Sequence, residues 1–252
     1  MKLRLLIIAI ICLAIGAGIG YKLIPHSIQS TPSNMIDGSK TIPLSIVSLH
    51  QDVSSSPSVD IEYPQFPSLP KDFNDSISSA VNEKLAQFKK DAAENDAARK
   101  ATADPAAKAS PSDYSFIASW QEAQINDRYV SFIIRFDSYT GGANGIQEMQ
   151  TFNYDIGRGM PIGLSDLFPN DPEYLKRVSD VSREQLTGSM TAVAGGQIQT
   201  DMLDQGTEPI AENFKDFTFT GYAVNIYFPK YAVAPGAFGE QHVTISRSEK
   251  AY

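Results

Sequence analysis

The chain has 252 residues, of which 42% are hydrophobic, so it is long and apolar enough to build a globular core. It holds 29 acidic and 21 basic residues; residues 1–24 carry three bases and no acid, which leaves 18 bases against 29 acids, a balance of −11, for the rest. This charge argues against nucleic acid as a partner, because nucleic-acid binding requires clustered Lys and Arg.

Residues 5–21 form an uncharged run that follows Lys2 and Arg4. As a helix this run spans about 26 Å, the short end of a transmembrane segment. We predict that residues 1–24 form a single membrane anchor with a cytoplasmic N-terminus, because basic residues precede the run. A cleaved signal peptide is the alternative. The one cysteine, Cys12, lies in this run, which excludes a disulfide within the chain.

Residues 25–44, rich in Ser, Thr and Pro, are expected to form a tether. Residues 45–113 are expected to form a strand–helix subdomain. It contains a short strand within residues 41–48 and an edge strand over residues 58–67 that is closed by Pro64. A loop with Pro105 and Pro111 ends this subdomain.

A helix over residues 71–100 is predicted inside that subdomain, with Asp72 or Asn74 as its N-cap. Apolar residues recur at spacings of four, four and three, which places them on one helical face. The residues expected on this buried face are Ile77, Val81, Leu85 and Phe88.

Residues 114–252 are expected to form a C-terminal α+β subdomain. Its first strands are predicted over residues 114–122, 129–139 and 147–154. In the strand over 129–139 apolar and polar residues alternate, so one face is expected to lie in the core and the other mostly in solvent.

The stretch TGGANG, residues 140–145, connects the second and third of these strands. Gly141 and Gly142 supply the positive φ that a tight hairpin requires, so a turn is the simplest interpretation. The aromatic, hydroxyl and amide side chains of Tyr139, Thr140 and Asn144 also suit a binding surface at a loop tip. Both interpretations remain open, and these three residues are the candidate ligand-binding residues.

The C-terminal part begins with a helix that Asp171 caps and Pro172 opens, with an apolar stripe at Tyr174, Val178 and Val181. Three strands follow within residues 214–246, with turns at Gly221 and at residues 229–239. The order strand, helix, strands, helix, strands predicts the α+β class, with antiparallel sheets and packed helices.

The sequence predicts no catalytic residue, metal ligand or cofactor. Its histidines lack metal-ligand spacing, and the GxSxG elbow of serine hydrolases and a phosphate-binding loop do not occur. One catalytic alternative remains, a glycan hydrolase that uses a pair of carboxylates. The carboxylates considered for this pair are Glu122, Asp137, Glu148 and Asp155.

Three stretches carry a resemblance: YPQFPSLPKDFNDSISSAVNEKL, SYTGGANGIQEMQTFNYDIGRGMPIGLSDLF and IYFPKYAVAPGAFGEQHVTI. In this order they resemble the extracytoplasmic domain shared by RsiV-type anti-sigma factors and the N-terminal part of PdaC-type peptidoglycan deacetylases. The resemblance covers roughly residues 45–248, and Asn144 stands where the family often has a histidine.

The resemblance implies an α+β fold and a non-catalytic binding or sensing module, anchored in a bacterial-type cell membrane, for cell-wall glycan or a lysozyme-like protein. Lysozymes are basic, and an acidic domain attracts them electrostatically. Only four residues precede the apolar run, so a sigma factor is not expected as a partner. A structural envelope protein with no soluble ligand is the alternative.

Overall fold

The computed structural model describes residues 40–52, 57–102, 113–141, 144–196, 198 and 200–247. The chain divides into two units, residues 1–38 and 39–252, and every described residue belongs to the second. The predicted anchor, most of the predicted tether and the loop with Pro105 and Pro111 lie outside the described residues. Within the described part, no helix combines the length and apolar character needed to cross a bilayer.

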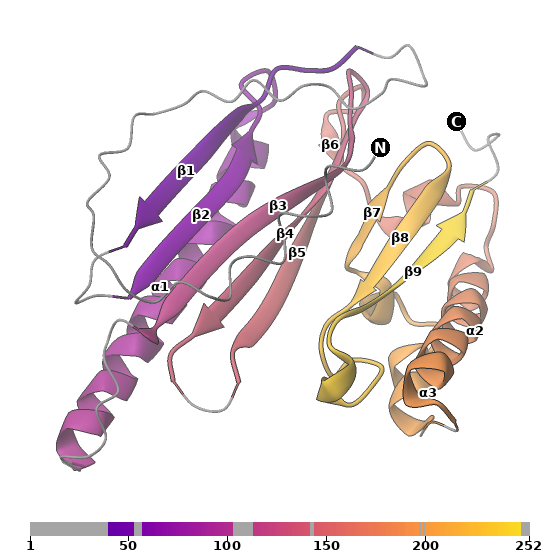
Figure 1. Cartoon of the computed structure of the whole chain (residues 1–252). Helices are drawn as coiled ribbons and strands as arrows, with labels where there is room; N and C mark the ends of the chain where they lie inside the picture. Colours follow the sequence, from indigo (N-terminus) through magenta and orange to yellow (C-terminus); the bar gives the residue numbers. More distant parts are fainter. Residues whose placement is uncertain are drawn as a thin grey trace, which may run out of the picture. The chain divides into compact units, whose positions relative to one another are not determined.

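Sheet A has six strands in chain order, and all neighbours are antiparallel except β2 and β3. Helix α1 (Lys71–Thr102) makes the crossover that a parallel pair requires, and it lies along one face of the sheet (Figure 1). The strands are β1 (Ser45–Gln51), β2 (Ser58–Gln65), β3 (Ser115–Ile125), β4 (Tyr129–Tyr139), β5 (Ile146–Asp155) and β6 (Met160–Pro161).

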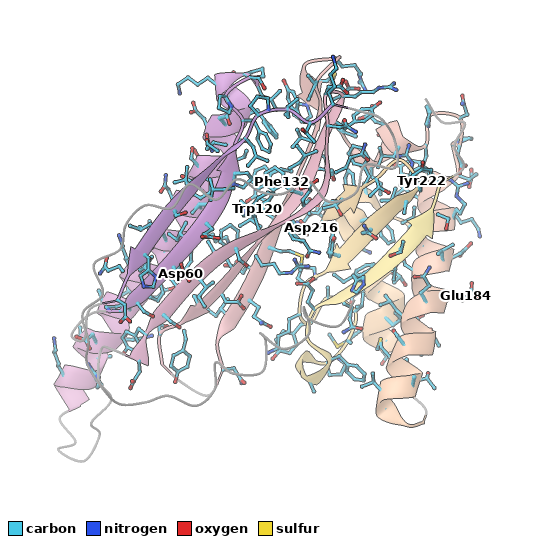
Figure 2. All side chains as sticks on the ribbon, turned by 45° about the horizontal axis from the view of Figure 1, so that its top comes forward. Asp60, Trp120, Phe132, Glu184, Asp216 and Tyr222 are labelled. Atoms are coloured by element: carbon cyan, nitrogen blue, oxygen red, sulfur yellow. The ribbon has the colours of Figure 1, made fainter. Side chains whose placement is uncertain are left out.

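Helix α1 buries the predicted apolar stripe, which confirms Ile77, Val81, Leu85 and Phe88 as core residues. These residues pack on sheet A in the first hydrophobic core, where Trp120 and Phe132 meet edge to face at 6.1 Å (Figure 2). The predicted N-cap is wrong, because the helix begins at Lys71. Asn74 instead binds the preceding loop: its Oδ1 accepts from the Phe66 N–H at 2.7 Å.

Strand β2 is not the edge strand that the sequence predicted, because all seven residues of β1 pair with residues 59–65 of β2. Pro64 fits inside the sheet because only Ser58–Ile61 of β2 pair with β3. The residue that lacks an N–H therefore lies beyond the parallel ladder.

Sheet B consists of β7 (Phe217–Phe219), β8 (Ala223–Phe228) and β9 (Gln241–Ser246), all antiparallel, which confirms the three predicted strands. Helix α2 (Tyr174–Ala194) packs beside β9, and α3 (Asp201–Gly206) follows it. Three short 3-10 helices complete this part of the fold: η2 (Leu164–Leu167), η3 (Ala211–Phe214) and η4 (Gly236–Phe238).

Helix α2 begins at Tyr174, three residues after the predicted cap. Asp171 accepts the Glu173 N–H at 3.0 Å and so shapes the turn before the helix. Val178 is fully buried, and Tyr174 and Val181 pack partly buried against the second hydrophobic core.

The two sheets join where strand β7 meets β4 and β5. Ser131 Oγ accepts the Phe219 N–H at 2.8 Å, and Asn153 Nδ2 donates to the Phe217 O at 2.7 Å. The prediction that one β4 face is mostly in solvent is therefore wrong, because Ser131 and Ile133 are buried on it. The buried residues of the first core lie between Val59 and Tyr154, and those of the second are Tyr129 and residues between Ile162 and Ile245. The subdomain boundary after residue 113 stays a prediction.

Candidate functional site

The β4–β5 hairpin, which carries the predicted ligand-binding residues, ends against helix α1. Asn95 of α1 donates from Nδ2 to the backbone O and the Oγ1 of Thr140, at 3.0 and 3.1 Å. Gly141 has a φ of 102°, and a Cβ built there lies 3.4 Å from Cε1 of Tyr114. Gly141 therefore turns the chain through its positive φ, as predicted, since a Cβ there would be in ordinary contact with Tyr114; Gly142 lies outside the described residues.

Tyr139 and Thr140 lie side by side at the end of this hairpin and are half-buried, whereas Asn144 is exposed. Tyr139 is the last residue of β4 and is paired with Ser115 of β3. The Thr140 hydroxyl already accepts a hydrogen bond, so Asn144 presents the most accessible polar side chain of the three. Their role in ligand binding stays a prediction.

A second feature lies in the connection between β8 and β9, residues 229–240, which we call the Tyr231 loop. Its first turn closes when the Ala232 N–H donates to the Pro229 O at 2.9 Å. Tyr231 occupies the third position with a φ of 73°, and it is the one non-glycine residue with positive φ among the described residues. A type II turn requires this conformation and strongly favours glycine there, so the tyrosine is held in a strained backbone.

The Tyr231 side chain is 61% exposed, yet its ring is supported from below. A Cβ built at Gly236 lies 2.4 Å from Cε1 and Cζ of the ring, so glycine is needed there while the ring keeps this position. The Lys230 Nζ lies 5.4 Å from the ring centroid. Buried Val233 and Ala234 fix the middle of the loop in the second core. The sequence predicted a turn here but not the strained, exposed aromatic ring.

An ion pair fastens the end of the Tyr231 loop to sheet A. Arg135 of β4 donates from Nε and Nη2 to the two carboxylate oxygens of Glu240, at 3.1 and 2.9 Å. The hydrogen bond to Glu240 raises the pKa of Arg135 above its usual value. The guanidinium also lies over the Tyr227 ring, 5.5 Å from its centroid. This bidentate geometry holds the loop in one position relative to β4.

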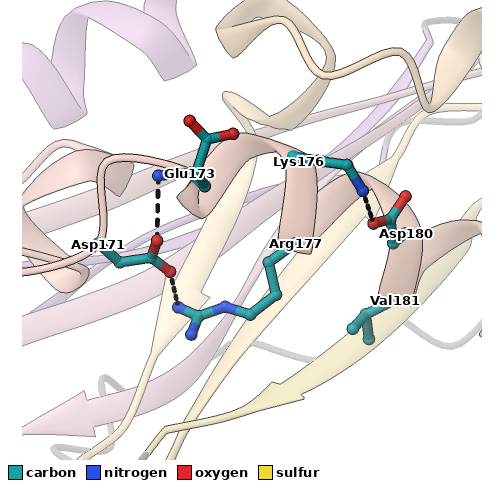
Figure 3. A pocket seen from close by; sticks show the side chains of 6 residues that line it. All are labelled: Asp171, Glu173, Lys176, Arg177, Asp180 and Val181. Carbon is teal, nitrogen blue, oxygen red and sulfur yellow. Dashed lines mark hydrogen bonds and ion pairs between the residues drawn. The ribbon is translucent and has the colours of Figure 1, made fainter.

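A shallow depression of about 380 Å³ lies at the start of α2, lined mainly by charged side chains (Figure 3). Asp171 pairs with Arg177 at 2.7 Å, and Lys176 pairs with Asp180 at 2.6 Å. The charges within the two pairs neutralise each other and Glu173 leaves one net negative charge, so the depression holds no concentrated charge that would select a ligand.

The four carboxylates considered for a hydrolase do not converge. Glu122 and Glu148 lie opposite Phe132 and Phe136 of β4, four residues or about 13 Å apart along the strand. Asp137 and Asp155 project from the other face, at positions eight residues or about 26 Å apart on β4. Glycosidase pairs lie roughly 5–9.5 Å apart. In the described part of the chain, no group of three or more His, Cys, Asp or Glu is placed to hold a metal ion.

Two family models match successive regions of the chain. Residues 51–147 match the family described as Deacetylase PdaC, and residues 165–248 match the family described as Protein of unknown function (DUF3298). The first region contains α1 and the β4 end of the hairpin, and the second contains sheet B and the Tyr231 loop. The resemblance to PdaC-type proteins is therefore confirmed, whereas the link to RsiV-type proteins stays a prediction.

Among curated proteins, the chain is similar to peptidoglycan-N-acetylmuramic acid deacetylase PdaC of Bacillus subtilis strain 168, with 32% identity over 119 residues. The match covers 47% of this chain and 25% of the relative, so the chain spans about a quarter of that protein's length.

Two solved structures share the fold. A DUF3298 family member from Bacteroides fragilis matches with a TM-score of 0.57, over 82% of this chain and 92% of that one. A DUF3298 family protein from Pseudomonas aeruginosa matches with a TM-score of 0.52 over the same shares. Both are 16% identical to this chain and so show the fold alone, which confirms the α+β class.

Proposed function

We propose that this chain, in which a PdaC-type region precedes a DUF3298 region, is a non-catalytic extracytoplasmic module that binds cell-wall glycan. The observation that carries the proposal is Tyr231, an exposed aromatic ring held in a strained turn. Positive φ in a non-glycine residue costs about 1–2 kcal/mol. Such strain persists where a side chain is needed at that place, most often in a binding site.

The geometry around Tyr231 suits stacking on a flat ligand. Gly236 lies against the ring and Tyr231 stays 61% exposed, so we expect little side-chain entropy to be lost when a ligand stacks on it. A sugar ring presents an apolar C–H face edged by hydroxyl groups, and tyrosine combines an apolar ring with a polar tip. The curated relative is named for its action on peptidoglycan, which supports glycan as the ligand class.

The uncharged run of residues 5–21 supports a location at the cell membrane. With Lys2 and Arg4 ahead of it, the N-terminus lies in the cytoplasm and the α+β part outside. Mass spectrometry of the protein extracted from membranes is expected to find the residues before Tyr21 attached. A mature N-terminus between residues 15 and 25 in the soluble fraction would contradict an uncleaved anchor.

A basic lysozyme-like protein is the second candidate ligand, and the charge favours it. Beyond residue 24 the chain carries 29 acids against 18 bases. Such a surface raises the association rate of a basic protein, most strongly at low salt.

The experiment measures retention of the full-length chain, purified in a mild detergent, on insoluble peptidoglycan and on immobilised lysozyme. Tyr231→Gly removes the ring and relieves the backbone strain. It is expected to weaken retention on peptidoglycan at least tenfold, with a Tm within about two degrees of wild type. Tyr231→Phe keeps the ring and is expected to bind like wild type.

Tyr222→Ala is the matched control, because Tyr222 is 55% exposed in the β7–β8 turn, at the other end of β8 (Figure 2). Equal retention of wild type and Tyr231→Gly would contradict the proposed site. Retention on lysozyme alone would select the second candidate. Retention on neither would leave the structural envelope role predicted as the alternative.

A further inference from the structure

The edges of sheet B are closed by side chains. On β7, Ser131, Thr151 and Asn153 bind the backbone of Phe217 and Phe219. On β9, the side-chain amide of Gln185 satisfies both backbone groups of Thr244: it donates to the Thr244 O at 2.8 Å and accepts the Thr244 N–H at 3.1 Å. Such caps stop another chain from pairing with an exposed edge.

The two edges of sheet A differ in how well they are protected against pairing with another strand. One edge consists of β6, which has two residues and ends in Pro161, and of residues 146–153 of β5, which β6 does not cover. Pro161 and the charged Glu148, which pairs with Lys84, make this edge a poor template for pairing. The β1 edge has seven residues, all exposed, with the sequence SIVSLHQ. No side chain of the described residues caps β1 as Gln185 caps β9. Its sequence also lacks the Lys and Pro residues that commonly block an edge.

Strand β1 also exposes more apolar surface than an unprotected edge strand normally does. Ile46, Val47 and Leu49 are 40%, 37% and 45% exposed. We propose that the outer edge of β1 is a docking site for an extended segment of a partner protein, which adds to sheet A as a further strand. Backbone hydrogen bonds supply affinity in this mode of recognition, and alternate side chains supply specificity.

The two faces of β1 determine the chemistry of that segment. Val47 and Leu49 lie opposite Tyr63 and Ile61 of β2, on the face toward α1. Side chains of the added strand on this face are therefore apolar. On the other face, Ser48 and His50 lie opposite Glu62 and Asp60 (Figure 2 labels Asp60).

Glu62 and Asp60 behind β1 favour basic side chains on the added strand, although Asp60 already lies 3.7 Å from Nδ1 of His50. A lysine on the added strand would lie beside Ser48, whose side chain is small. The lysine side chain can therefore extend over Ser48 to Glu62 on β2, which lies about 4.8 Å, one strand spacing, beyond Ser48. From residue 40 to 65 the chain holds Asp52, Asp60 and Glu62 against one lysine, Lys40. The occupant is therefore an extended segment that alternates basic and apolar residues.

Other occupants fit less well. A glycan lacks the regular backbone N–H and C=O groups that pair with a strand edge. A second copy of this chain brings another net charge of −8 to the interface, which opposes pairing.

The test uses a fluorescent seven-residue peptide that alternates Lys and Val, with fluorescence anisotropy against the full-length chain in mild detergent. This peptide is expected to bind. A proline at its centre removes an N–H and is expected to weaken binding at least tenfold, as is replacement of every Lys by Glu.

On the protein, Leu49→Lys places a charge on the apolar side of the edge and is expected to weaken binding of the Lys/Val peptide at least tenfold. Leu49 is exposed, so the variant is expected to melt like wild type. Ile210→Lys is the control, because Ile210 is 50% exposed outside sheet A and the added charge is the same. It is expected to bind within twofold of wild type.

Three results would overturn the proposal: no binding of the Lys/Val peptide, equal binding of the proline peptide, or equal binding by Leu49→Lys. Dimerisation of wild type that Leu49→Lys abolishes, seen by sedimentation, would assign the edge to a second copy instead.

Discussion

Gly141 and Tyr231 both adopt positive φ, at 102° and 73°, for different reasons. At Gly141 the turn needs a backbone conformation that residues with a Cβ rarely adopt, and a Cβ there would only contact Tyr114. At Tyr231 the turn favours glycine, yet a large side chain occupies the position and packs over Gly236. Gly141 only allows the backbone to turn, whereas Tyr231 places an aromatic ring at the surface although its backbone conformation is unfavourable for a tyrosine.

The hairpin residues can be separated from the backbone by substitution. We expect Gly141→Val to lower stability by about 1–2 kcal/mol through its positive φ. Asn144→Ala, at an exposed position, is expected to shift the Tm by no more than about two degrees, whereas Tyr139→Ala, at a half-buried strand end, is expected to lower it further. If the tip binds ligand, both variants are expected to weaken peptidoglycan capture at least tenfold. Thermal melts and sedimentation with peptidoglycan measure both effects. Unchanged peptidoglycan capture by both Ala variants would show that the hairpin only turns the chain and does not bind the ligand.

Asp216, before β7, is a half-buried acid whose charge opposes folding (Figure 2). Burial raises the pKa of its carboxyl. The folded state therefore holds this proton more tightly than the unfolded state, and stability is lost as the pH rises through the raised pKa. We expect Asp216→Asn to raise the Tm at pH 7, and this gain to disappear below about pH 4.

Thermal melts at the two pH values check this expectation. Asp127→Asn, at an exposed bend, serves as the control. A Tm of Asp216→Asn below that of wild type at pH 7 would show that the carboxylate stabilises the fold.

At the scale of elements, β7 depends on side chains for what a neighbouring strand normally supplies. Ser131 accepts from the Phe219 N–H and donates to Asn153 Oδ1 at 2.7 Å, and Asn153 in turn binds the Phe217 O. Ser131 is fully buried. This short network therefore lets two sheets meet without leaving buried backbone groups unsatisfied.

We expect Ser131→Ala to lower the free energy of unfolding by about 1–3 kcal/mol, because it leaves the buried Phe219 N–H without its acceptor. Chemical denaturation measures the change. Ser119→Ala, on the exposed side of β3, is expected to change stability by less than about 0.5 kcal/mol. Equal effects of both variants would mean that water replaces the Ser131 hydroxyl.

At the scale of the whole molecule, sheets A and B share buried contacts within one unit, residues 39–252. Arg135 and Glu240 add an ion pair between them, 105 positions apart in the sequence. The PdaC-type and DUF3298 regions are therefore two family matches within one compact unit.

A fragment of residues 40–252 is expected to fold alone and to unfold in one transition, within about two degrees of the full-length chain. EDTA is expected to leave this Tm unchanged, since the described residues hold no metal-binding cluster. Calorimetry with and without EDTA checks both statements. Two separate transitions, or a shift of several degrees with EDTA, would contradict them.

The sequence alone predicted the features that depend on local spacing and turn chemistry. The buried stripe of α1, the three strands of sheet B and the positive φ of Gly141 all follow from periodicity or from glycine at a hairpin. The hairpin tip could be proposed as a site for the same reason, because its side chains are neighbours along the chain.

The tertiary structure decided everything that depends on partners distant in sequence. Strand β2 lies inside sheet A because β1 pairs with it. One face of β4 is buried because β7 packs there, where Phe219 lies 88 residues after Ser131. The alternation of β4 is compatible with either one or two covered faces. Tyr231 became a candidate only in three dimensions, since closure of its loop over Gly236 sets both its strained φ and its exposed ring.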